Sequence, residues 1–63
     1  MFSYKKMRKI ASRGGFALRE VNVDNVYKYA LVNNRTRREH HYVALDDIRP
    51  DIEEIVEGGT PFA

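Results

Sequence analysis

Two glycine pairs, Gly14-Gly15 and Gly58-Gly59, are the strongest local constraint on how this chain can fold. Each pair follows a stretch in which apolar residues recur at helical spacing. Glycine readily adopts the left-handed backbone that ends many helices. The sequence therefore predicts a helix before each pair.

The first predicted helix runs from about residue 4 to residue 13. Ser3 is its expected N-cap, because a serine hydroxyl can accept a hydrogen bond from an amide of the first turn. One side of the helix is apolar and consists of Tyr4, Met7, Ile10 and Ala11. The other side is basic and consists of Lys5, Lys6, Arg8, Lys9 and Arg13.

The closing helix is expected to start from an N-cap at Asp46 or Asp47. Pro50 fits its first turn, where the backbone amides have no helical partner to lose. Its residues on one face form a single apolar stripe, consisting of Ile48, Ile52, Ile55 and Val56.

Three segments between the helices, 16–21, 26–32 and 39–44, have the composition of β-strands. The stretch 22–25 and the pair Asn33-Asn34 supply residues that favour turns. The order helix, strand, strand, strand, helix is best satisfied by an antiparallel meander, so we expect an α+β fold of the form α-β-β-β-α. Its three-stranded antiparallel sheet should have both helices packed on one face. The single domain is expected over residues 3–57, with a core of Phe16, Leu18, Tyr29, Leu31, Val43, Ile48, Ile52 and Ile55.

The C-terminal tail, residues 58–63, has no periodic pattern. We expect it either to fray or to place Phe62 on the core or on another chain.

The chain has 63 residues and no cysteine. A domain of this size buries only about 60% of the surface that its unfolded chain exposes, so its stability is expected to be marginal. Without cysteine it forms neither disulfides nor a thiolate zinc site, which favours a cytoplasmic location. No segment approaches the roughly 20 apolar residues of a membrane span, and no apolar run of a secretion signal follows the basic start.

The sequence gives no support for catalysis. His40 and His41 are adjacent on a predicted strand, so their side chains point to opposite faces and cannot chelate one metal ion together. The only serines are Ser3 and Ser12, and no nucleophile and base pair is apparent. We expect no catalytic residues, no metal, no cofactor and no enzymatic activity.

Charge is divided unevenly along the chain. Residues 1–41 contain ten basic and three acidic residues, a net charge of +7, whereas residues 42–63 contain one basic and six acidic residues, a net charge of −5. If the two segments form different faces, the first suits a polyanion or an acidic partner. Alternatively, the two segments attract each other and help the fold to close.

The basic residues of the first helix and of the hairpin from Asn33 to His41 are the candidate binding residues. Guanidinium groups offer paired donors that match phosphate oxygens. The candidates for nucleic-acid or partner binding are Lys5, Lys6, Lys9, Arg13, Arg35, Arg37, Arg38 and His40. Tyr27, Tyr29 and Tyr42 either stack on bases or belong to the core.

Three stretches, KKMRKIASRGGFALREV, YKYALVNNRT and YVALDDIRPDIEEIV, carry a resemblance over roughly residues 5–56. They resemble small bacterial and phage proteins of uncharacterised role that have a basic helix, a β-meander and an acidic closing helix. This resemblance implies a compact regulator or a host-directed factor. The topology is also similar to double-stranded RNA-binding domains, but their second helix starts with lysines where this chain has Asp46 and Asp47. The fold is also similar to that of integrase arm-binding domains, which insert a three-stranded sheet into the major groove.

The sequence thus predicts a small non-enzymatic DNA-binding regulatory module that contacts phosphates through its first helix and the Asn33–His41 hairpin. The alternative is a phage- or prophage-encoded inhibitor or adaptor that binds an acidic surface of a host protein. A continuous basic face would favour DNA, and separate basic patches would favour a protein partner. A homodimer is also expected to be possible, because an open sheet leaves an exposed edge.

Overall fold

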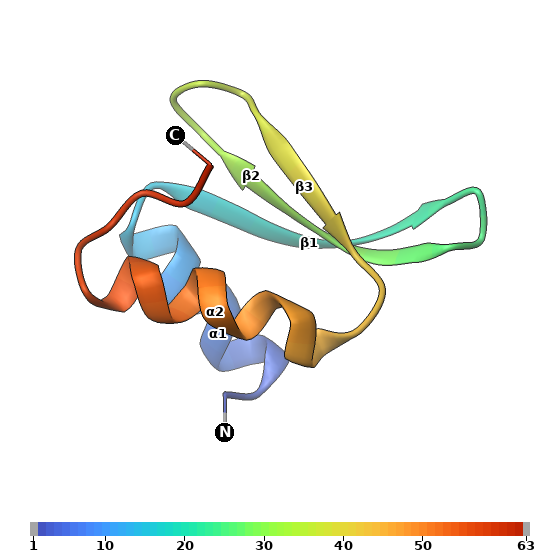
Figure 1. Cartoon of the computed structure of the whole chain (residues 1–63), viewed down its shortest axis with the longest axis horizontal. Coiled ribbons are helices and arrows are strands. Elements are labelled where there is room, and N and C mark those ends of the chain that lie inside the picture. Colours follow the sequence, from blue (N-terminus) through green and yellow to red (C-terminus); the bar gives the residue numbers. More distant parts are fainter. Residues whose placement is uncertain (1, 63) are drawn as a thin grey trace.

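The computed structural model describes residues 2–62, which form a helix, three strands and a second helix (Figure 1). In chain order these elements are α1 Tyr4–Arg13, β1 Phe16–Val23, β2 Tyr27–Asn33, β3 Glu39–Tyr42 and α2 Leu45–Val56. The strands form one antiparallel sheet in the order β1-β2-β3. Both helices lie on the same face of this sheet, α1 against β1 and α2 nearer β3. The predicted α-β-β-β-α fold is confirmed.

The first helix begins and ends as its sequence predicts. The Ser3 hydroxyl accepts a hydrogen bond from the Lys6 amide at 3.2 Å. At the other end Gly15 has a φ of +85°, a left-handed conformation that favours glycine. Gly14 has a different role, because a Cβ at this position would collide with Cγ2 of Ile55 in α2. The absence of a side chain at Gly14 therefore allows the two helices to approach each other.

The turn between β1 and β2 uses two residues that tolerate a left-handed backbone. Asp24 and Asn25 have φ angles of 52° and 58°, which suits the tight turns of β-hairpins. The register between β1 and β2 shifts between Glu20 and Val23, so β1 contains a bulge and extends beyond the predicted end at Val21.

The core lies between the sheet and the two helices. Its buried residues come from all five elements and comprise Met7, Ala11, Phe16, Leu18, Leu31, Tyr42, Ile48, Ile52 and Ile55. Six of these were predicted from the sequence, whereas Met7, Ala11 and Tyr42 were not. Tyr29 is only half-buried, and its ring lies 5.8 Å from that of Tyr4.

The prediction for the junction between β3 and α2 was wrong. The strand ends at Tyr42, so Val43 leaves the alternating pattern and is 49% exposed where burial was expected. The N-cap of α2 is Ala44 and not an aspartate. Asp47 instead lies in the first turn, where its carboxylate accepts a hydrogen bond from the Ala44 amide at 3.3 Å. This is one half of a capping box, and it starts the helix earlier than predicted.

The described part of the C-terminal tail packs on the domain. Pro61 is buried, and the Phe62 ring meets the Phe16 ring edge to face at 5.7 Å. The Phe62 ring also stacks on the His40 ring, with the two ring centroids 4.0 Å apart. Of the two placements expected for Phe62, the structure has the one on the core.

A part-buried hydrogen bond joins β3 to α2. The Tyr42 hydroxyl donates to the carboxylate of Asp51. Burial raises the pKa of Tyr42 well above its ordinary value, and the hydrogen bond and the negative charge of Asp51 raise it further. The native state therefore holds this proton more tightly than the unfolded chain does.

Ile52→Ala is expected to lower the free energy of unfolding by about 2–5 kcal/mol, because it leaves a cavity in the core. Ile52 is fully buried, whereas Val56 on the same helix is 59% exposed. Val56→Ala is therefore the control and is expected to change stability by less than about 0.5 kcal/mol. Urea melts measure both values. Coinciding melts of wild type and Ile52→Ala would show that α2 is not packed as described.

Tyr42→Phe is expected to change how stability depends on alkaline pH. A raised pKa stabilises the native state in full below the unfolded value of about 10, and this contribution is lost as pH rises through the folded value. Wild type should therefore lose more stability than Tyr42→Phe between about pH 8 and pH 11 in urea melts. The exposed Tyr27 supplies the control, since Tyr27→Phe should retain the wild-type dependence. Parallel profiles of stability against pH for wild type and Tyr42→Phe would contradict the raised pKa of Tyr42.

Candidate nucleic-acid interface

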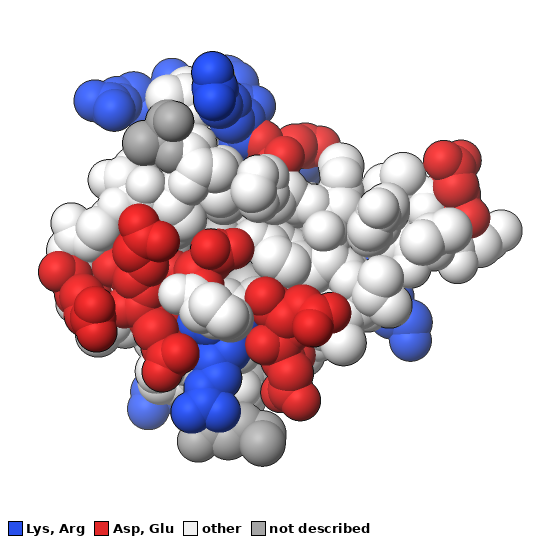
Figure 2. Space-filling model, viewed as in Figure 1, with Lys and Arg blue, Asp and Glu red and all other residues white. Residues whose placement is uncertain are grey.

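The two helices carry opposite charge on a flat molecule. The Cα trace measures 32 × 28 × 15 Å, and α2 lies in front of α1 when the molecule is seen along its shortest axis (Figure 1). α1 contains five basic and no acidic residues, whereas α2 contains five acidic residues and one basic residue. In this view acidic side chains cover the α2 side, and basic side chains gather at the β2–β3 hairpin and at the lower edge (Figure 2).

The four lysine and arginine candidates of α1 lie together. Lys5, Lys6, Lys9 and Arg13 line one shallow surface hollow with Ser3 and Ile10. A second hollow shares Lys5 and Lys9 with the first and adds Arg8 and Ser12. The spacing of three and four residues places these side chains on adjoining parts of the helix surface.

Two further hollows connect α1 with the hairpin. The first, named here the α1–β1 hollow, is lined by Arg8, Ser12, Phe16, Ala17, Leu18, Arg19 and Asn34. The next is lined by Gly14, Gly15, Phe16, Asn33, Arg35 and Thr60. Neighbouring hollows share Lys5 and Lys9, then Arg8 and Ser12, and finally the buried Phe16; this series from Lys6 to Arg35 is named here the basic path. Within residues 2–62, no acidic side chain lines any of these four hollows.

Arg8, Ser12, Arg19 and Asn34 are members of the basic path that the sequence did not single out. The helical spacing of Arg8 from Lys5 and Ser12 was a usable signal, because residues three and four apart share a face. No local pattern brings Arg19 of β1 or Asn34 of the hairpin next to α1. Their proximity follows only from the way β1 packs against that helix.

The charges of α1 and of the hairpin loop have no carboxylate partner in the described part of the chain. The ion pairs there are Arg19–Glu39, His41–Glu39 and Arg49–Glu53, and none includes a basic residue of α1 or of residues 34–38. These basic side chains are exposed. They can therefore turn to an external anion without breaking an internal ion pair.

The hairpin loop is ordered by Asn33, which is only 3% exposed. Its side-chain oxygen accepts hydrogen bonds from the amides of Arg35 at 2.9 Å and Thr36 at 3.3 Å. The Arg37 amide donates to the Asn33 carbonyl at 2.8 Å, and the Arg38 amide donates to the Thr36 hydroxyl at 3.3 Å. The amides of residues 35–38 are thus used within the loop, and the Asn34 amide donates to the Gly15 carbonyl, which leaves the side chains as the donors that a partner can reach.

Arg37 has a φ of 67°, in the left-handed region. This conformation costs roughly 1–2 kcal/mol for a residue with a side chain. The loop hydrogen bonds hold Arg37 in this conformation, and a strained position of this kind is a frequent feature of functional loops.

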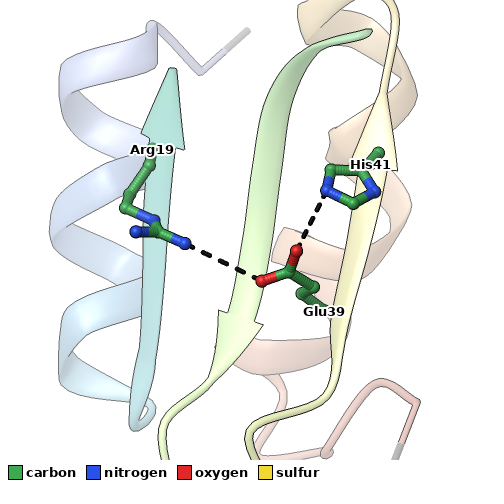
Figure 3. Close-up of polar contacts among 3 residues, drawn as sticks. All are labelled: Arg19, Glu39 and His41. Carbon is green, nitrogen blue, oxygen red and sulfur yellow. Dashed lines mark ion pairs between the residues drawn. The ribbon is translucent and has the colours of Figure 1, made fainter. Parts of the chain in front are cut away.

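The His40 ring stacks on Phe62 of the tail, and His40 lines none of the four hollows. His41, its neighbour, belongs to the opposite face of the sheet, where its Nε2 lies 3.0 Å from a carboxylate oxygen of Glu39. The second oxygen of Glu39 lies 3.7 Å from Nη2 of Arg19, so these three side chains bridge β1 and β3 across β2 (Figure 3). Beneath them Ala30 is fully buried.

The tyrosines lie outside the basic path. Tyr42 is in the core and Tyr29 packs on Tyr4, while Tyr27 is 38% exposed with its ring 5.5 Å from that of His41. Over residues 2–62, no group of three or more histidine and acidic side chains is arranged to hold a metal ion. No helix within that range is long and apolar enough to cross a membrane.

Comparison with protein-family models, with curated proteins and with solved structures finds no match for this chain.

Asn33→Ala is expected to lower the free energy of unfolding by about 1–3 kcal/mol, because it removes two part-buried hydrogen bonds to loop amides. The neighbouring Asn34 is exposed and its side chain makes no hydrogen bond within the described residues, so Asn34→Ala should cost less than about 0.5 kcal/mol. Urea melts compare the two variants. Equal effects at the two positions would show that Asn33 does not order the loop.

Proposed function

We propose that this protein is a small cytoplasmic DNA-binding regulatory module without enzymatic activity, and that α1 and the Asn33–His41 hairpin contact backbone phosphates. The observation that carries the proposal is the basic path, which runs from Lys6 to Arg35 with no acidic side chain in its lining. A series of basic side chains along one side of a domain is an electrostatic footprint typical of nucleic-acid binding.

The distribution of charge also supports one orientation on a polyanion. The basic surface of α1 attracts phosphates, and the acidic surface of α2 repels them. The protein is therefore expected to meet a duplex with the α1 side and to turn α2 toward solvent.

The available donors support contacts with phosphates more than with bases. The loop amides are occupied, so Arg35, Arg37 and Arg38 act through their guanidinium groups, which suit paired phosphate oxygens. Stacking on unpaired bases requires exposed aromatic rings along the basic surface. The tyrosines are engaged elsewhere in this fold, which favours duplex DNA bound through its backbone.

An inhibitor or adaptor that binds an acidic protein surface is the second candidate. The observation that favours it is the separation of the hairpin and lower-edge basic groups by acidic side chains on the α2 side (Figure 2). A module of that class would use the same arginines against carboxylates and would show little affinity for DNA at about 0.15 M salt.

Replacing Arg35, Arg37 and Arg38 together by alanine is expected to weaken duplex binding and to flatten its salt dependence. Each phosphate contact contributes about −0.9 to the slope of log affinity against log salt, so the slope should change by up to about three such increments. The loss should be nearly the same for unrelated duplex sequences, because phosphate contacts do not read bases. Fluorescence anisotropy of a labelled duplex at several salt concentrations measures the slope.

The control is the double variant Lys28→Ala/Arg49→Ala, which removes two basic residues that lie outside α1, the hairpin loop and the basic path. It should leave the salt slope close to that of wild type. Absence of duplex binding by the wild type at low salt, where screening is weakest, would exclude the DNA function and favour the protein partner.

A further inference from the structure

The α1–β1 hollow combines four polar side chains that suit one phosphate group. Arg8 and Arg19 line it with Ser12, which has a hydroxyl, and Asn34, which has a side-chain amide; all four residues are exposed, and the Arg19 guanidinium is turned toward Glu39 (Figure 3). The hollow has a volume of about 310 Å³. This leaves room for a phosphate with bridging waters, since a water occupies about 30 Å³ in the liquid.

The fold fixes the walls of this hollow. Arg8 and Ser12 are one helical turn apart on α1 and therefore share a face. The Asn34 amide donates to the Gly15 carbonyl at 3.0 Å, which holds the base of the hairpin beside the end of α1. Phe16 and Leu18 are buried and support the floor from β1.

Arg19 already has an acidic neighbour, but the contact is weak. Its guanidinium lies 3.7 Å from Glu39, and the two side chains are 59% and 40% exposed. Exposed ion pairs of this kind contribute little to stability. A phosphate can therefore replace Glu39 as the partner of Arg19, while Glu39 retains its contact with His41 on β3 (Figure 3).

We infer that the α1–β1 hollow is a phosphate-binding subsite, in which Arg8, Ser12, Arg19 and Asn34 hold one phosphodiester group between α1 and the hairpin. The inference rests on the proposed DNA function and deepens it, because it places the central contact at residues outside the predicted set. Glu39 beside Arg19 acts as a competing anion, so it limits the affinity of the subsite.

The first test compares Arg19→Gln with Lys28→Gln in duplex binding. Each substitution removes one positive charge from an exposed strand residue, but Lys28 does not line the hollow. Arg19→Gln should weaken binding about tenfold, as expected for loss of a hydrogen bond to a charged group. Lys28→Gln should weaken it by no more than about twofold. Equal losses would overturn the subsite and leave only a diffuse charge effect.

The second test compares Glu39→Gln with Glu20→Gln. Each substitution removes one negative charge from a strand residue that pairs with β2. Of these two glutamates, Glu39 is the one that forms an ion pair with Arg19. Glu39→Gln should therefore strengthen duplex binding by a larger factor than Glu20→Gln does. An equal gain for the two variants would contradict competition at Arg19.

Inorganic phosphate distinguishes failure of the subsite from failure of the proposed function. In ¹⁵N-labelled wild type it should shift the amide resonances of Ser12, Ala17 and Asn34, and the double variant Arg8→Gln/Arg19→Gln should lose these shifts. Thermal melts check that the double variant remains folded. Phosphate shifts without duplex binding would support the subsite for free phosphate and exclude the DNA function. Duplex binding without phosphate shifts, and with equal losses for Arg19→Gln and Lys28→Gln, would overturn the subsite alone.

Discussion

One apolar layer between the sheet and the two helices determines the rest of this structure. Met7, Leu18, Leu31, Ile48 and Ile52 are almost completely buried in it, and they come from α1, β1, β2 and α2. Each helix has a single apolar stripe, so packing that stripe on the sheet forces its charged residues outward. Because the two helices lie side by side on one sheet face, their opposite charges appear on different sides of a thin molecule.

The sequence was informative wherever a local rule decides the structure. The Ser3 cap and the glycine that ends α1 follow from backbone chemistry. Helical period predicts the buried Ile48, Ile52 and Ile55 of α2, but Val56 at the end of the predicted stripe is exposed. Local rules failed at Val43 and Ala44, since alternation continues in the sequence after the strand has ended. The end of β3 is instead determined by tertiary structure: Tyr42 is fixed in the core by its bond to Asp51, and the chain must then turn to start α2.

The candidate site divides in the same way. The basic surface of α1 could be predicted, because helical periodicity alone separates its lysines from its apolar stripe. The contributions of Arg19 and Asn34 could not, because they depend on packing between elements distant in sequence. His40 was grouped with the hairpin arginines from its position in the chain. Its stacking on Phe62 depends on a tail whose sequence has no periodic pattern.

The most direct measurement is a map of the surface that a duplex touches. Titration of ¹⁵N-labelled protein with a short duplex at low salt should shift the amide resonances of α1, of Gly15 and of residues 34–38. Those of the solvent-facing residues of α2, such as Arg49 and Glu53, should stay in place. Shifts concentrated on α2, or an unchanged spectrum throughout, would contradict a basic surface that binds phosphate.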